Sequence, residues 1–333
     1  MQRAASLLWF PIFFAIALPL TFQFANNHST AHHIPVAVVG STHEMRVLAD
    51  ELHRVQAGGF EVQRSPSVAA ATAQVRDRKV AAAYVAGTTA VVYVARAASA
   101  IRANYVQGVF TRLATSDGQA PRLVDLVPLA SRDGGTGIFF FVFPLMMAGL
   151  ITAIVLVQLP AWGIGRRMTV VAVVGAVGAL ASYCAAVGLH VLPAKPLLLA
   201  YAFLLTQVYG QLMVGAAPLL KQYFLSVSLT LALILSVPSS SGTLSPDLMP
   251  AFFRDLSDAL PLAQAAKVTR DIAYFHDNGI ARPTLILALW AAVAVGAVAF
   301  ARLRLLRTRT ADTPRALSPP NRRIASQRPS TVS

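Results

Sequence analysis

The sequence contains six apolar stretches, each close to the length that a helix needs to cross a lipid bilayer. Roughly 20 apolar residues span a hydrocarbon core of about 30 Å. The stretches cover residues 6–25, 137–159, 168–192, 197–219, 222–238 and 283–303. We therefore predict an α-helical integral membrane protein with six transmembrane helices. Residues 1–25 are interpreted as an uncleaved N-terminal anchor helix, because the apolar part is longer than that of a signal peptide and no A-x-A site follows.

Composition supports a membrane protein over the soluble classes. Only 13% of the 333 residues are charged, 56% are hydrophobic and the mean hydropathy is +0.59. Soluble domains average about 25% charged residues. Disordered, collagen-like and nucleic-acid-binding proteins are thereby excluded, although the net charge is +14. We expect membrane lipid as a partner and no nucleic acid.

The positions of the basic residues predict the orientation of the spans. Lys and Arg close to span ends are retained on the cytoplasmic side. With six spans, one side collects Arg3, Arg166, Arg167, Lys221 and the eight arginines from Arg302 to Arg328, at and beyond the end of the sixth stretch. We therefore predict a multi-pass protein of the cell (plasma) membrane with both termini cytoplasmic. Residues 26–136 and 239–282 then lie outside.

The C-terminal residues 304–333 are basic and contain four prolines. We predict a disordered cytoplasmic tail, because proline prevents a stable helix. Basic residues beside a cytoplasmic leaflet gain about 1 kcal/mol each from anionic lipid. Anchoring therefore accounts for this tail.

Residues 26–136 differ in texture from the apolar stretches and predict a small extracytoplasmic α/β domain inserted between the first and second spans. Short β-rich runs cover residues 36–39, 60–62, 80–85 and 91–94. Apolar residues recur at helical spacing over 45–55 and 101–113. Because helices alternate with strands, we expect a largely parallel sheet.

Motifs for catalysis are not found in the sequence. It lacks the nucleophile elbow G-x-S-x-G, the phosphate loop G-x-x-x-x-G-K-[ST] and the dinucleotide fingerprint G-x-G-x-x-G. Five histidines gather near the start of the 26–136 segment, but no carboxylate or cysteine joins them at a metal-ligand spacing. We predict no catalytic, cofactor or metal site, and any ATP hydrolysis is expected from a partner subunit.

Residues 239–282 predict a helical hairpin before the last span. Phe252, Phe253 and Leu256 fall on one side of a helix, whereas Arg254 and Asp258 occupy the other as i, i+4 partners. Two amphipathic helices at the outer membrane surface are expected, with this segment forming one outer hairpin of the 137–303 transmembrane domain. A surface-lying connector without a transport function is an equal alternative.

The order of these parts resembles a known family: one span, an α/β outer domain, five spans, and a helical hairpin before the last. It is similar to the membrane subunits of ATP-binding-cassette (ABC) type-2 transporters, especially the branch related to the phage infection protein and its YhgE-like relatives. The stretches that carry the likeness are Ile34 to Val39, Val127 to Leu129, Arg132 to Gly135, Ser240 to Gly242, Pro250 to Phe253, Leu260-Pro261 and Arg270 to Tyr274.

The resemblance implies a permease subunit that forms a homo- or heterodimer, pairs with a separate ABC ATPase, and exports a hydrophobic or envelope-related substrate. The loop that would couple to the ATPase is the short one ending at Arg166 and Arg167. Phe252, Phe253, Leu256 and Arg270 become candidates for the outer mouth of the pathway. The alternative function is a non-transporting envelope protein, either a receptor or a secretion-machine accessory, whose outer domain binds a partner.

Two amides inside the fourth span are further candidates. Gln207 and Gln211 are one turn apart in an apolar stretch. Polar groups in hydrocarbon usually face a protein interior or an aqueous cavity. They either line a pathway at the dimer axis or form hydrogen bonds between helices, and we favour the second interpretation because uncharged amides commonly serve that role.

Overall fold

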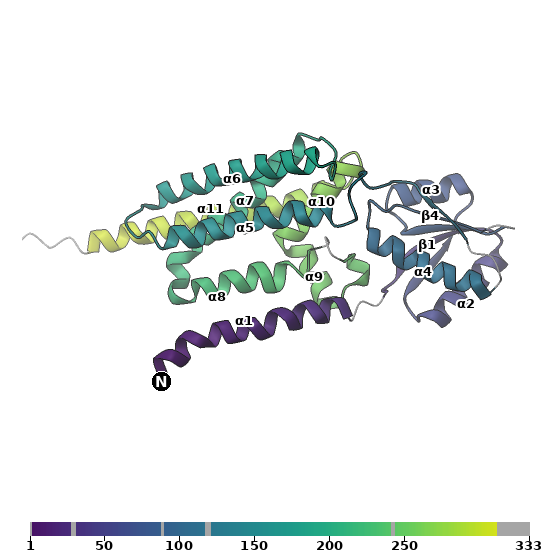
Figure 1. Ribbon diagram of the computed structural model, residues 1–333, viewed down its shortest axis with the longest axis horizontal. Coiled ribbons are helices and arrows are strands. Elements are labelled where there is room, and N and C mark those ends of the chain that lie inside the picture. Colours follow the sequence, from purple (N-terminus) through teal and green to yellow (C-terminus); the bar gives the residue numbers. More distant parts are fainter. Residues whose placement is uncertain (1, 28–30, 88–89, 117–120, 241–243, 312–333) are drawn as a thin grey trace, which may run out of the picture.

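The computed structural model describes residues 2–27, 31–87, 90–116, 121–240 and 244–311, and it is mostly helical (Figure 1). Long helices form an elongated bundle, and a small mixed sheet with its own helices lies at one end of the bundle.

In the described part of the chain, four helical segments are long and apolar enough to cross a membrane. They are α5 (Gly137–Val157), α6 (Ile164–Gly188), the segment Leu197–Ser236, and Ala281–Arg304 within α11 (Ala281–Ala311). The first helix, α1 (Gln2–Asn27), has a shorter apolar part, Trp9–Ala25. These helices fit a multi-pass membrane protein.

The segment Leu197–Ser236 folds into two helical arms. Helix α7 (Leu197–Leu220) ends at Lys221, whose φ of 49° is left-handed. The chain continues through η1 (Lys221–Tyr223), α8 (Phe224–Leu229) and the π-helix η2 (Thr230–Ser236). Tyr209 donates a 3.0 Å hydrogen bond to Ser236, although a straight helix would place these residues about 40 Å apart. The second arm is therefore antiparallel to α7, but shorter than the roughly 20 residues of a full span.

Helix α7 lies at the centre of the bundle and contacts α5, α6, α10 and α11. Glycines make this close packing possible. A Cβ at Gly149 of α5 would lie 2.6 Å from the carbonyl oxygen of Thr206, and one at Gly215 of α7 would lie 2.6 Å from the backbone nitrogen of Val298. Small residues let helix backbones approach where apolar surroundings supply no driving force.

Five strands form one sheet within the described residues: β1 (Ile34–Val39), β2 (Phe60–Arg64), β3 (Ala82–Val85), β4 (Val91–Val94) and β5 (Arg122–Asp125), in the order β2-β1-β3-β4-β5. The four strands expected from the sequence are confirmed, and β5 was not expected. β1 pairs in parallel with β2 and β3, and β4 with β5, but β4 is antiparallel to β3. The sheet is mixed because residues 86–90 are too few for a crossover, which needs a dozen or more residues.

Helices cover both faces of the sheet. Helices α2 (Thr42–Val55) and α4 (Ala100–Ser116) pack on the face that carries Val36 and Val38, whereas α3 (Val68–Arg76) packs on the face of Ala37. Successive side chains of a strand point to opposite faces, so this division follows from the alternation in β1. We refer to residues 34–125 as the sheet region.

The segment before α11 differs from the two surface-lying helices expected. It contains η3 (Pro246–Leu248), α9 (Ala251–Ala259) and α10 (Pro261–Tyr274). Eleven of the 14 residues of α10 are buried, and this alanine-rich helix contacts α5, α7 and α11. The indole nitrogen of Trp290 donates a 2.7 Å hydrogen bond to the carbonyl of Ala259. Because Trp290 lies about 12 Å along α11 from Arg282, the α9–α10 turn penetrates the bundle.

Helix α11 continues to Ala311, so residues 304–311 of the expected disordered tail are helical. Residues 312–333, where the rest of that tail was predicted, lie outside the described residues.

Candidate functional site

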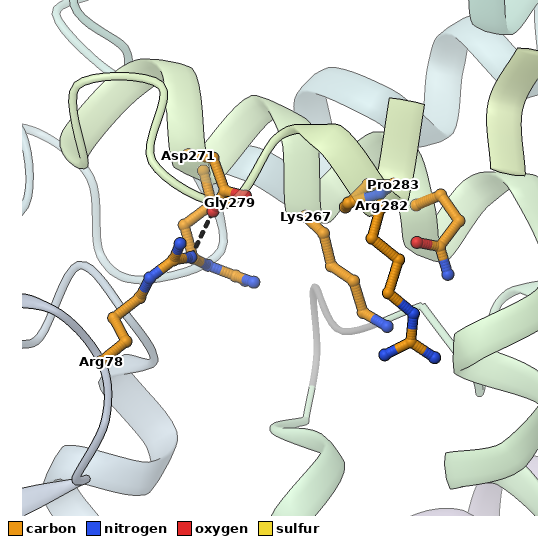
Figure 2. Close-up of a pocket in the computed structure, with 8 residues that line it drawn as sticks. Arg78, Lys267, Asp271, Gly279, Arg282 and Pro283 are labelled. Carbon is orange, nitrogen blue, oxygen red and sulfur yellow. Dashed lines mark hydrogen bonds and ion pairs between the residues drawn. The ribbon is translucent and has the colours of Figure 1, made fainter. Parts of the chain in front are cut away.

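A basic pocket of about 290 Å³ lies where α10 and the start of α11 meet the turn that follows α3 (Figure 2). The turn after α3 supplies one side of its wall, and the consecutive helices α10 and α11, far from that turn in sequence, supply the rest. The lining residues are Arg78, Gln264, Lys267, Arg270, Asp271, Gly279, Arg282 and Pro283. We call this cavity the basic pocket, because four of its eight lining residues are cationic.

One wall joins the sheet region to the bundle. Arg78 forms an ion pair with Asp271, whose side chain is only 4% exposed, and also donates to the carbonyl of Asn278. The same guanidinium lies over the ring of Phe275, 4.5 Å from its centroid. Charge-assisted hydrogen bonds and a cation–π contact therefore hold Arg78 in one orientation.

The loop between α10 and α11 is shaped to admit this arginine. His276, Asp277 and Gly279 all have positive φ, which turns the chain within a few residues. A Cβ at Gly279 would lie 2.6 Å from Nη2 of Arg78 and 3.1 Å from a carboxylate oxygen of Asp271. Only glycine fits here without displacing the ion pair.

The opposite wall carries two cations that share one carboxylate at the rim. Asp258 of α9 accepts a hydrogen bond of 2.7 Å from Lys267 and one of 3.4 Å from Arg282. Lys267 also donates to the carbonyl of Ser257 at 3.0 Å. Partial burial acts to raise the pKa of Asp258, but Lys267 and then Arg282 outweigh it and lower that pKa below its usual value. In Figure 2, the Lys267 and Arg282 side chains extend side by side into the same space.

Asp271 is the most buried charge of the pocket, and Arg270 beside it is partly buried. Burial lowers the pKa of Arg270 to about 10, with the nearby cations Arg102 and Arg78 adding to the effect and Asp271 opposing it. Arg270 therefore remains protonated at neutral pH. Burial also raises the pKa of Asp271, although Arg78 and Arg270 act in the opposite direction. Crowding of like charges in a largely buried place is typical of functional sites, and it also occurs in structural ion-pair networks.

Further polar contacts fix the surroundings of the pocket. Arg102 of α4 forms an ion pair of 2.5 Å with Asp247 of η3. The Tyr274 hydroxyl, at the end of α10, donates to Asp133 at 3.4 Å and accepts from the backbone of Ala130 at 3.3 Å. The segment from η3 to α10 is thereby attached to other elements at both of its ends.

Of the predicted outer-mouth residues, only Arg270 lines the basic pocket. Phe252 is 58% exposed, whereas Phe253, its neighbour on α9, is 2% exposed. The Phe253 ring packs against Phe24 of α1, with centroids 6.3 Å apart, and joins the core that extends from the sheet region. Leu256 is partly buried against the same core. The structure therefore separates these aromatic neighbours into one surface residue and one core residue.

Gln207 and Gln211 connect α7 to α6. The amide of Gln207 donates to the carbonyl of Val171 at 3.3 Å, and that of Gln211 donates to Met168 at 3.2 Å. Gln211 also donates to the Gln207 side chain at 3.1 Å. These are the contacts expected of interhelical hydrogen bonding.

Arg166 and Arg167 lie in the first turn of α6, just after the short loop from α5. The Arg166 guanidinium lies 3.9 Å from the centroid of the Trp162 ring, and Arg167 donates to the carbonyl of Leu159 at 2.8 Å. The exposed Arg166 is therefore held at the surface at the end of the bundle opposite the sheet region.

The basic pocket could not be predicted from patterns in the sequence. Arg78 and Asp271 are 193 positions apart, and an arginine after a short helix looks in the sequence like an ordinary surface residue. Only Arg282 could have pointed to the pocket from the sequence. It lies next to the sixth apolar stretch, on the side of the membrane where the ends of the other stretches have few basic residues.

No family model, curated protein or solved structure matches this chain. Among the described residues, no group of three or more His, Cys, Asp or Glu side chains is arranged to hold a metal ion.

Proposed function

We propose that this protein is the membrane permease subunit of an ABC type-2 exporter, driven by a separate ATPase, that moves a hydrophobic or envelope-related substrate outward. The proposal includes a cell-membrane location, six membrane crossings, cytoplasmic termini, and the sheet region as an inserted extracytoplasmic domain. It also includes a dimer of permease subunits. The order of elements and the resemblance described above support it.

The observation that carries the proposal is the polar hairpin inside an apolar bundle. Helix α10 brings the buried side chains of Gln264 and Thr269 among helices α5, α7 and α11, whereas the partly buried Lys267 faces α9. Polar groups at such a depth are costly and usually mark a substrate or ion pathway. A bundle that only anchored the sheet region would gain nothing from them.

Buried hydroxyls beside the hairpin support the same function. Four of them form no hydrogen bond with any described residue: Ser228, Ser239, Ser240 and Ser257. They lie on the α8–η2 arm, on the turn after it and on α9, which contacts η2. Buried polar groups normally have hydrogen-bond partners. Four buried hydroxyls without one are what a polar pathway between the α8–η2 arm and α9 would require.

The ATPase contact is placed at the loop between α5 and α6. Arg166, stacked on Trp162, offers a rigid cation there. Charge reversal in Arg166→Glu should abolish association with the ATPase. The matched control, Arg302→Glu, changes an exposed arginine near the same end of the bundle and should not.

The test is purification of the tagged chain from its native membranes. An ABC ATPase should copurify, and its hydrolysis of ATP should be absent from the isolated chain. Hydrolysis by the isolated chain, or no associated ATPase under conditions that preserve membrane complexes, would contradict the proposal.

A receptor or secretion-machine accessory is the second candidate, and one observation favours it. Strand β1 begins beside the bundle, where His32 bonds the carbonyl of Asp247, so its carboxyl end points away from the bundle. Open α/β sheets commonly bind ligands at the carboxyl ends of their strands. Removal of the sheet region should then abolish partner binding, while variants of the hairpin should not affect it.

A further inference from the structure

We propose that the basic pocket binds a phosphate group, either the head group of a membrane lipid or a soluble phosphate. This inference does not depend on the proposed function, because it concerns only the residues that surround the cavity.

The pocket has more positive charge than its own carboxylates neutralise. Four cations line it: Arg78, Lys267, Arg270 and Arg282. Asp271 is the one lining carboxylate, and Asp258 stands at the rim between Lys267 and Arg282. Among these six groups an excess of two positive charges remains, and Asp133, which does not line the pocket, also acts on Arg270. This excess is comparable to the charge of a phosphate monoester near neutral pH.

Partial burial strengthens the attraction of this excess positive charge for an anion. Asp271 is 4% exposed and the Lys267 side chain is 21% exposed, so solvent screens these charges less than it would on an open surface. Arg270 is partly buried, and its pKa of about 10 keeps it charged at neutral pH. An anion entering the pocket would offset the cost of holding these cations close together.

The donors suit phosphate in geometry as well as charge. Guanidinium groups present planar forks that match phosphate oxygens, and an ammonium adds a compact point charge. Lys267 and Arg282 project into the same space (Figure 2). The cavity volume of about 290 Å³ is just below the range of roughly 300–1,000 Å³ that is typical of ligand pockets. The pocket therefore has room for a head group but not for a whole amphiphile.

The position of the pocket brings it level with membrane phosphates. Arg282 is the second residue of the candidate span Ala281–Arg304. Below it on the same face of α11, at spacings of three and four residues, lie Leu285, Leu289 and Val293, all exposed. A lipid with its phosphate in the pocket could lay an acyl chain along this stripe.

The test uses the purified full chain in the neutral detergent dodecyl maltoside, with a fluorescent-tailed phosphatidic acid followed by anisotropy. Binding should saturate and be displaced by unlabelled phosphatidic acid but not by dioleoylglycerol, which lacks the phosphate. Replacing Lys267→Gln and Arg282→Gln together should weaken binding by about tenfold or more, because two charge-assisted contacts are lost.

Two further variants make the test specific. Lys195→Gln removes an exposed cation from the loop between α6 and α7, at the same end of the bundle, and should leave binding unchanged. Asp258→Asn removes the competing carboxylate and should tighten binding. A variant that merely damaged the fold would weaken binding, so this gain distinguishes the two causes. If the double variant aggregates, Arg282→Gln alone carries the test, since this side chain is 73% exposed.

Competition with inorganic phosphate and glycerol 3-phosphate identifies the source of the ligand. Displacement by these soluble anions at low millimolar concentration indicates a soluble phosphate, whereas displacement by phosphatidic acid alone indicates a lipid. Either result supports the phosphate site. Equal weakening by Lys195→Gln, equal competition by dioleoylglycerol, or no tightening by Asp258→Asn would overturn it.

Discussion

Arg78, in the turn after α3, forms an ion pair with Asp271 near the end of α10, and so attaches the sheet region to the helical bundle across 193 positions of sequence. Asp271 is almost fully buried, and burial already raises its pKa. The pair therefore acts as a structural joint in which each charge depends on the other.

Removing one partner should destabilise the protein. Arg78→Gln leaves the buried carboxylate without its closest cation, which costs about 3 kcal/mol in pairs of this kind. Thermal unfolding in detergent should shift to lower temperature, and Arg78→Gln combined with Asp271→Asn should recover much of the loss. Lys79→Gln is the control, because Lys79 is 70% exposed and its ion pair with Asp77 spans 3.8 Å. Equal effects of the Arg78 and Lys79 variants would contradict the joint.

Gly279 should tolerate no side chain. Its φ of +96° disfavours any other residue, and a Cβ would approach the Arg78 guanidinium to 2.6 Å. Gly279→Ala should lower the free energy of unfolding by about 1–3 kcal/mol. Gly163→Ala provides the comparison, since a Cβ there meets no atom within 4 Å. Chemical denaturation of both variants measures the difference, and a neutral Gly279→Ala would show that the loop adapts.

The two phenylalanines of α9 should behave differently. Phe253→Ala empties a core position between α1 and α9 and should cost about 3–5 kcal/mol of stability. Phe252→Ala removes a 58% exposed ring and should leave the unfolding temperature nearly unchanged. Phe252 is therefore the better probe of a substrate pathway, because lost activity in Phe253→Ala would follow from lost structure. Similar unfolding temperatures for both variants would contradict this assignment.

Alkaline pH should destabilise the contact between α10 and the loop that precedes α5. Burial is the main cause that raises the pKa of Tyr274 from 10.0 to about 12. The hydrogen bond with Ala130 lowers this pKa and the contact with Asp133 raises it, each by less than burial does. The folded state therefore holds this proton more tightly than the unfolded state. The associated stability is complete below pH 10 and is lost as the pH rises from about 10 towards 12. Tyr274→Phe should flatten that part of the stability profile, and an unchanged profile would exclude Tyr274 as the responsible group.

Local patterns were sufficient for the elements but not for their assembly. Alternation in β1 and helical spacing over residues 45–55 and 101–113 predicted strands and helices that the structure contains. β5 was missed because four residues with polar ends, Arg122 and Asp125, show little alternation. Strand β4 was expected, but its antiparallel direction was not, because the short connection from β3 overrides the rule that alternating helices and strands give parallel sheets.

The hairpin shows a second limit of sequence reasoning. The amphipathic pattern of α9 is real, and it predicted that Arg254 would pair with Asp258 one turn away. Asp258 instead pairs with Lys267 and Arg282, because the turn at Leu260-Pro261 folds α10 back beside it. Periodicity gives the faces of a helix, but it does not tell whether the partner of a face is a lipid or another helix. The place of Arg78 in the basic pocket could not be predicted either, because it depends on a tertiary contact that has no local signal in the sequence.

The orientation of the chain in the membrane gives the last prediction. If both termini are cytoplasmic, the sheet region and the loop between α5 and α6 lie on opposite sides, because α5 separates them. With Cys184 replaced by alanine, a cysteine at the exposed Gln63 of β2 should react with an impermeant maleimide in intact cells. A cysteine at the exposed Ala161 should react only after lysis. Labelling of Ala161→Cys but not Gln63→Cys in intact cells would reverse the topology. It would also place Arg166 on the outside, where a cytoplasmic ATPase has no access, and so would remove the proposed coupling loop. Labelling of both in intact cells, with an internal cytoplasmic protein unlabelled as the control for leakage, would show that α5 does not cross the membrane.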